Sequence, residues 1–333
     1  MKKYFVGIDI SKEKLDFCVI TDSGVIDERI VENTIEGVAY HLKLLLGKGV
    51  NQEETLLCAE FTGQYGYPLC CACTEHGYDL WMEDPMQIKQ RSGVRRGKDD
   101  KADAKKIAEY ACRFQSCCRL YDLPSTNLVS LKQLLSERDM YLSHKSCYKG
   151  QLSDQKKFMN AEDYTKKSKR LKALVKNLEK LIEDIDRQID ELIESDSNLK
   201  NQMTLLKSID GVGDGTARKM IVVTNAFTAF RSPRQFCCYA GVAPFEYRSG
   251  SSIYTRKKVS QRADKSIKKL LHLAALSSIK VQGELHDYYV RKIEEGKNKM
   301  LVINAVRAKL VLRMFAVIKR NEPYEKKHEF SLV

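Results

Sequence analysis

The sequence lacks any apolar run long enough to cross a bilayer. Its most apolar late segment, residues 300–318, carries Arg307, Lys309 and Arg313, and charged side chains are rare in membrane spans. This segment therefore predicts an amphipathic helix and no membrane partner. The N-terminal apolar run meets Asp9 too soon for a signal peptide, so we expect a cytoplasmic protein.

The sequence also lacks the paired spacing of a zinc site, although it contains 11 cysteines. Cys70 and Cys73 form a C-x-x-C motif near His76, but no second ligand pair follows at a comparable spacing. An odd number of cysteines, several of them adjacent, argues against a disulfide framework. We expect reduced thiols that act as small apolar residues.

Acidic residues are too few to balance the basic ones. The chain of 333 residues has 57 Lys and Arg against 44 Asp and Glu, a net charge of +13, and its pI is about 9.1. This excess favours DNA or RNA as partner, because neutralised phosphates release counterions. A chain of this length can bury sizeable cores in two or three domains.

Four acidic residues nevertheless occupy positions that suit chemistry. Asp9 closes a strand-like run, YFVGID, and Glu60 closes a second one, TLLCAE. Asp100 and Asp103 open a helical run in RRGKDDKADAKK, where residues three apart share one face. Taken singly, each is more readily a cap or a solvated charge.

Taken together, the four carboxylates predict a metal site. Converging carboxylates repel one another unless a cation offsets them, and hard oxygen ligands suit Mg²⁺ or Mn²⁺. Two such ions would activate and stabilise oxygens around a phosphodiester. The sequence therefore favours a metal-dependent nuclease or recombinase core.

The order of predicted elements in residues 1–122 supports this convergence. Three strand-like runs (FVGIDIS, KLDFCVIT, GVIDERIVE) precede a helix, the strand ending at Glu60, a helix, the strand YDLWMED and the helix ADAKKIAEYACRF. This is the order of the α/β ribonuclease-H-like fold of RuvC type, whose first and fourth strands are neighbours. Nearby basic residues fit a phosphate-binding surface, with a solvated basic face as the alternative. They are Arg91, Arg95, Arg96, Lys98, Lys101, Lys105 and Lys106.

Residues 123–200 form a second region, which is helical and highly charged. A line of residues alternates spacings of three and four, as in a coiled-coil seam. The line consists of Leu171, Leu174, Leu178, Leu181, Ile185, Gln188 and Leu192. Self-association and an intramolecular hairpin with the preceding helix are equally favoured, and both can hold.

Residues 201–333 form the third region, which we expect to be mostly helical. In LLKSIDGVGDGTARKMIVV, two helices flank a glycine turn, as in a helix-hairpin-helix element. Gly211 and Gly213 would let backbone amides approach a phosphate there, although glycine turns are common without that role.

The segment RSGSS is the second candidate for chemistry. It places Ser249 beside a glycine, between Arg248 and Arg256, and Arg262 opens the basic helix that follows. Such a serine can attack a phosphodiester if its proton is removed and the leaving oxygen is stabilised. By composition alone, the segment is more often a turn.

Three motifs in the first region resemble the DEDD-type transposases of the insertion sequence 110 family, which are relatives of the Piv-type DNA invertases. In chain order the motifs are VGIDISKEKLDF, CAEFTGQYG and RRGKDDKADAKKIA. IDGVGDGTARKMI and FCCYAGVAPFEYRSGSS resemble the second domain of that family. The resemblance implies a RuvC-like domain whose DEDD carboxylates bind divalent metal. These match Asp9, Glu60, Asp100 and Asp103.

The resemblance further implies a serine that forms a covalent link to DNA. Ser249 is the best match, with Ser251 and Ser252 as alternatives. It also implies a structured guide RNA from the flank of the element, which pairs with donor and target DNA. It implies oligomers with composite sites, so we expect a dimer or a tetramer.

The sequence departs from the family pattern at two places. Asp99 stands where Thr is common, and Gln261–Asp264 replaces Lys-Arg-Gly-Asn at a place of expected DNA contact. The alternative function is a RuvC-type Holliday-junction resolvase with metal-activated water as nucleophile, which needs no serine domain. An actin-like ATPase needs a second copy of the fold, and no repeat is found. A non-catalytic RNA-binding protein leaves the four carboxylates unexplained.

Overall fold

The computed structural model describes residues 2–91, 100–245, 248–249, 253–254, 258–259 and 263–325. Side chains at 100–101, 245, 248–249, 253–254 and 258 lie outside this description. The chain forms two compact units, Met1–Leu123 and Pro124–Val333, and each is described by itself. The second unit holds both the helical middle and the C-terminal region, so the division into three domains stays a prediction.

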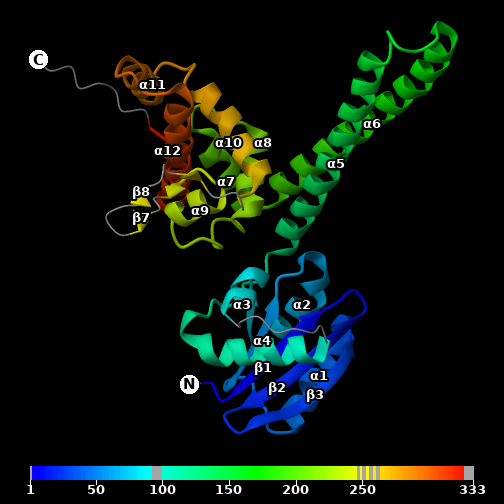
Figure 1. The fold of residues 1–333 in the computed structure, drawn as a ribbon, viewed down its shortest axis with the longest axis vertical. Helices are drawn as coiled ribbons and strands as arrows, with labels where there is room; N and C mark the ends of the chain where they lie inside the picture. The colour runs from blue at the N-terminus through cyan, green and yellow to red at the C-terminus, as the bar shows by residue number, and fades with distance from the viewer. Residues whose placement is uncertain are drawn as a thin grey trace, which may run out of the picture. The chain divides into compact units, whose positions relative to one another are not determined.

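A five-stranded sheet forms the centre of the first unit (Figure 1). β1 (Tyr4–Ile10), β2 (Lys14–Thr21) and β3 (Gly24–Glu32) are antiparallel neighbours, while β4 (Thr55–Glu60) and β5 (Asp79–Glu83) run parallel to β1. The strand order is β3-β2-β1-β4-β5. This is the ribonuclease-H-like topology, and it confirms the predicted α/β class and the pairing of the first and fourth strands.

The two faces of the sheet have separate cores, because side chains alternate along a strand. Val6 and Ile8 pack on the face of α1 (Ile35–Gly47) and α2 (Tyr67–Glu75). Phe5 packs on the face of α4 (Asp100–Phe114), which lies across the strands in Figure 1. The short helices η1 (Gly63–Gly66), α3 (Pro85–Arg91) and η2 (Gln115–Cys117) complete the unit.

Gly7 allows α4 to lie directly on β1. A Cβ at this position would come within 2.0 Å of the Ala104 carbonyl oxygen and 2.2 Å of the Ala108 nitrogen. Any larger residue would push the helix away, so this glycine sets the height of α4 above the sheet.

The second unit begins with a long helical hairpin, drawn in green in Figure 1. α5 (Thr126–Asp154) and α6 (Ala161–Ser195) lie side by side, and Ser125 and Asn160 cap their N-termini. The hairpin that the sequence allowed is therefore present.

The hairpin buries a different line of α6 from the predicted seam. The buried residues are Ser168, Val175, Ile182, Ile185, Ile189 and Ile193. Leu174 is 46% exposed and Leu181 is 37% exposed, so only Ile185 of the predicted seam is buried. α6 carries two adjacent apolar lines, and α5 packs on the isoleucine-rich one.

The remaining helices surround one core. They are α7 (Ser197–Lys207), α8 (Asp214–Val223), α9 (Pro233–Tyr239), α10 (Lys265–Ser278), α11 (Glu284–Glu294) and α12 (Lys299–Arg320). Two short strand pairs join β6 (Pro244–Phe245) to β9 (Lys258–Val259), and β7 (Arg248–Ser249) to β8 (Ile253–Tyr254). Within the described residues, no helix has the length and apolar character of a membrane span.

Candidate functional site

Asp9 and Glu60 lie side by side at one edge of the sheet. β1 and β4 are parallel and Ile8 pairs with Ala59, so the two acids occupy the next position on each strand. Gly7 on β1 and Cys58 on β4 face α4. Asp9 and Glu60 come two residues after them, so both acids point to the same face of the sheet. Each is half-buried. The predicted neighbourhood of these carboxylates is observed.

Asp103 lies close enough to act on Glu60. Burial first, and then the negative charges of Asp9 and Asp103, raise the pKa of Glu60, while Lys106 partly offsets the effect. Like charges that crowd a half-buried carboxylate are relieved when a cation binds among them. The oxygen donors of this edge therefore fit a hard divalent cation.

Asp100 opens α4 one turn before Asp103, and its side chain is not described. Within the described residues, no three Asp, Glu, His or Cys side chains are already arranged to hold a metal ion. The site as described is thus three neighbouring carboxylates, with the fourth predicted ligand at the start of the same helix.

Sequence reasoning missed a buried acid beside this group. Asp16 pairs with Asp9 across β1 and β2 and is only 3% exposed. Its Oδ2 lies 3.0 Å from Lys14 Nζ, whereas its Oδ1 has no hydrogen-bond partner among the described atoms. The sequence signal for this acid was the segment KLD, in which Lys14 and Asp16 are two residues apart and therefore lie on one face of a strand.

A second missed acid, Glu83, ends β5 and pairs in register with Glu60. The hydroxyl of Tyr110 on α4 donates to Glu83 Oε2 at 3.0 Å. The acidic edge therefore continues across β5, and the strand-final acid of YDLWMED was its signal.

Few of the predicted basic residues can be placed. Arg91 ends α3 and lies 5.1 Å over the ring of Phe114. Phe114 follows Asp103 by eleven residues, or about 16 Å along the helix. Arg95, Arg96 and Lys98, and the side chain of Lys101, lie outside the described residues. A role in phosphate binding stays a prediction for all of them.

The predicted helix-hairpin-helix element consists of α7, a glycine turn and α8, but its glycines differ. Gly211 has a φ of +87°, and a Cβ there would lie 2.5 Å from the Ala274 carbonyl oxygen of α10. Gly213 caps α8 with open space around it and no side-chain cap. Gly211 thus serves close packing, and Gly213 leaves room for a ligand near the backbone.

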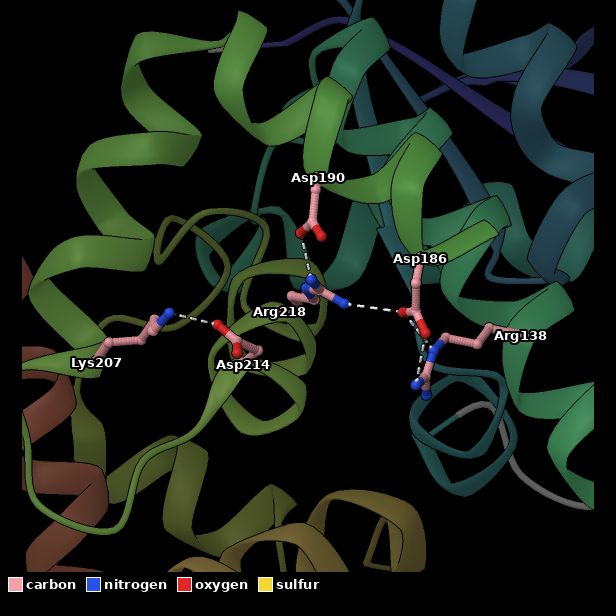
Figure 2. Close-up of polar contacts among 6 residues, drawn as sticks. All are labelled: Arg138, Asp186, Asp190, Lys207, Asp214 and Arg218. Carbon is pink, nitrogen blue, oxygen red and sulfur yellow. Dashed lines mark hydrogen bonds and ion pairs between the residues drawn. The ribbon is translucent and has the colours of Figure 1, made fainter. Parts of the chain in front are cut away.

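Figure 2 shows how α8 is fixed to α6. Arg218, whose side chain is 10% exposed, donates to Asp186 Oδ1 at 3.2 Å and also pairs with Asp190. Arg138 of α5 holds the same Asp186 through bonds of 2.8 and 3.1 Å. The Arg218 guanidinium is therefore committed to carboxylates.

The first turn of α8 is occupied by a further ion pair. Asp214 lies 2.7 Å from Lys207 of α7 (Figure 2). The pairing lowers the pKa of Asp214, so the turn keeps a negative charge next to Gly213.

The described part of the serine segment lies in a short antiparallel strand pair. Arg248 and Ser249 of β7 pair with Tyr254 and Ile253 of β8. Their side chains, the connecting residues 250–252, and Arg256 and Arg262 lie outside the description.

Asp264 explains part of the departure from the family pattern. It caps α10 by accepting from the backbone N–H of Ser266 at 2.8 Å and of Ile267 at 3.2 Å. The Tyr239 hydroxyl also donates to it, at 3.2 Å. Asn and Asp cap helices about equally well, so Asp in place of Asn preserves this local structure.

All 11 cysteines are free thiols. Burial raises the pKa of Cys70 to about 12 and raises the pKa of Cys73 further still. Neutral, buried thiols of this kind are packing residues.

Two family models match the chain. Residues 6–155 match a model described as a transposase, of the DEDD type of IS110, and residues 203–290 match the Transposase IS116/IS110/IS902 family. Pilin gene-inverting proteins of Moraxella lacunata and Moraxella bovis are each 26% identical over 99% of this chain and 100% of their own length.

Shorter similarities are found as well. The Insertion element IS110 uncharacterized 43.6 kDa protein of Streptomyces coelicolor is 26% identical over 36% of this chain and 30% of its own length. A solved structure of RuvC from T. thermophilus with a Holliday junction substrate covers 36% of this chain and 99% of its own, at 14% identity and a TM-score of 0.29. The two family models together include all four predicted acids and the serine segment, and with the inverting-protein relatives they identify the chain as an IS110-type DEDD transposase or recombinase, an enzyme that acts on DNA.

Proposed function

We propose that this transposase cleaves and rejoins DNA with Mg²⁺ or Mn²⁺ held by Asp9, Glu60, Asp100 and Asp103. Membership of a DEDD family implies dependence on a divalent cation in general. The observation that carries the proposal is the shared edge of Asp9 and Glu60, where burial and the charges of Asp9 and Asp103 raise the pKa of Glu60. When bound, the ions would stabilise charge on the phosphate oxygens.

We further propose that Ser249 is the nucleophile. Its Oγ forms a bond to phosphorus, its proton passes to a base or water, and the leaving deoxyribose oxygen takes up a proton. The resulting phosphoserine ester retains the energy of the phosphodiester, so strands can be exchanged and rejoined without ATP. The support is the family match around the serine segment, and Ser251 is the competing assignment.

A structured guide RNA is the proposed source of target choice. The net charge of +13 suits binding to two nucleic acids, and base pairing would carry sequence specificity as in other guided effectors. We also propose a dimer or tetramer. Leu174 and Leu181, which the hairpin leaves exposed, are available for self-association.

A recombination assay tests the metal proposal. The protein is expressed with its native flanking DNA, and new donor–target junctions are amplified. Asp9→Asn and Glu60→Gln should each abolish junctions. Asp84→Asn is the matched control, because Asp84 is an exposed acid near Glu60. Its Oδ1 accepts a hydrogen bond from the backbone N–H of Met86, and an asparagine can keep this bond. Full activity of Glu60→Gln would contradict the proposal.

Sequencing of the RNA that co-purifies tests the guide. One abundant, structured transcript from beside the reading frame is the expected result. Only heterogeneous cellular RNA would argue for an unguided invertase or resolvase.

A further inference from the structure

The outer part of the helical hairpin is strongly basic. Residues 145–180, which we name the distal arm, contain 11 basic and 4 acidic side chains, a net charge of +7 out of +13 for the chain. Residues 181–196 next to it contain 1 basic and 7 acidic side chains. The hairpin is thus polarised along its length, and its distal half carries much of the positive charge of the protein.

Most of this charge lies beyond the hydrophobic core of the unit. The buried core of the second unit reaches into the hairpin only as far as Leu135 on α5 and Ile185 on α6, and the partly buried Tyr141 packs against it. In Figure 1 the two helices continue beyond that point with only each other as neighbours within their unit. The arm therefore presents its side chains to solvent on most sides.

Four exposed lysines form a stripe on the arm. Lys169, Lys172, Lys176 and Lys180 follow one another at intervals of three and four residues, so they share one face of α6 over about 16 Å. Within the described residues, none of them has a carboxylate partner, unlike Lys149, which lies 3.0 Å from Glu179. Like charges at this spacing destabilise a helix, and a bound polyanion would reverse the effect.

An aromatic side chain marks the end of the arm. Phe158 lies between α5 and α6, follows Lys156 and Lys157 directly, and is 87% exposed. An aromatic ring beside basic residues is the usual platform on which a nucleic-acid base stacks.

We propose that the distal arm binds RNA at a loop, with the backbone along the lysine stripe and an unpaired base on Phe158. This proposal rests on the proposed RNA-guided function. Duplex DNA keeps its bases stacked inside the helix, whereas proteins usually recognise RNA at loops with splayed-out bases. A second copy of the chain is disfavoured on the stripe by like charge. Leu174 and Leu181 lie on another face of α6, so self-association through them leaves the stripe free.

Binding of a labelled RNA stem-loop to the full-length protein tests the proposal. The stripe variant is Lys169→Gln/Lys172→Gln/Lys176→Gln, since Gln and Lys have similar helix propensity. The control, Lys297→Gln/Lys319→Gln/Arg320→Gln, removes the same charge from exposed positions elsewhere in the unit. Fluorescence anisotropy over a salt series gives the slope of log K against log salt.

The stripe variant should reduce this slope by about 2, at about 0.7 per phosphate contact with a single strand. The control should leave it nearly unchanged. Phe158→Ala should weaken binding about five-fold or more, and Phe158→Tyr should restore it.

Four results would overturn the proposal. An equal loss in the control would assign the attraction to the overall charge, and an equal loss of duplex DNA binding would remove the preference for RNA. If the wild type binds the stem-loop and the arm variants bind equally well, the arm is excluded while RNA guidance stands. A wild type that binds no RNA would remove both proposals.

Discussion

Replacing Gly7 with alanine should separate α4 from β1. The new Cβ would lie 2.0 Å from the Ala104 carbonyl oxygen, whereas ordinary contacts begin at 3.4 Å. The obstructing atoms belong to the backbone, so the helix must move by about 1.4 Å. Overpacking of this kind lowers the free energy of unfolding by about 1–3 kcal/mol. The movement also displaces Asp103 from Glu60, and a misplacement of about 1 Å lowers a rate by about 100-fold.

The single tryptophan makes this effect measurable. Trp81 is 2% exposed, and its ring centroid lies 5.2 Å from that of Tyr110 on α4. Tryptophan emission during urea unfolding therefore reports the contact between α4 and the sheet. Gly47→Ala is the control, because a Cβ there meets nothing within 4 Å. If Gly7→Ala matched the wild type in unfolding midpoint and in recombination, the described contact of α4 with β1 would be wrong.

Three further predictions concern single positions. Glu60→Gln should stabilise the metal-free protein and remove its stabilisation by Mn²⁺ in thermal unfolding. The pKa of Glu60 is raised in the fold, so the metal-free wild type should lose stability as the pH rises above the usual glutamate pKa. The variant should not show this loss. Asp264→Ala should lower the free energy of unfolding by about 0.5–2 kcal/mol through loss of the α10 cap, whereas Asp264→Asn should change it little in urea unfolding. Gly211→Ala should destabilise the fold in urea unfolding through its positive φ and its contact with α10. Gly213→Ala should destabilise it less, because open space surrounds Gly213 and only the weaker N-cap preference of alanine acts; unchanged DNA affinity of this variant in filter binding would exclude a phosphate contact at the turn.

The sheet and its acidic edge were predictable because the relevant signals are local. Alternating side chains fixed which residues share a face, and the order of strands and helices allowed one topology. Asp9 is the penultimate residue of β1 and Glu60 is the last residue of β4, so parallel pairing alone brings them together. Asp16 and Glu83 follow from the same alternation once the register is known, and the register was not visible from the sequence.

The helical unit was less predictable because its contacts are tertiary. Two apolar lines run along α6, and only the surface of α5 decides that Ile182 is buried and Leu181 is not. The glycines between α7 and α8 also depend on tertiary contacts. Gly211 is required by the approach of α10, which is distant in sequence, so the motif alone could not separate its role from that of Gly213.

Mapping the covalent bond between protein and DNA shows whether a serine and a metal-bound carboxylate group act together. The full-length protein is incubated with Mg²⁺, its co-purified RNA and DNA carrying the ends of the element, and adducts are digested and identified by mass spectrometry. We expect one phosphoester on Ser249, which is absent with chelator, in Ser249→Ala and in Glu60→Gln. An adduct that persists in Ser249→Ala, or cleavage with no adduct at all, would contradict this expectation.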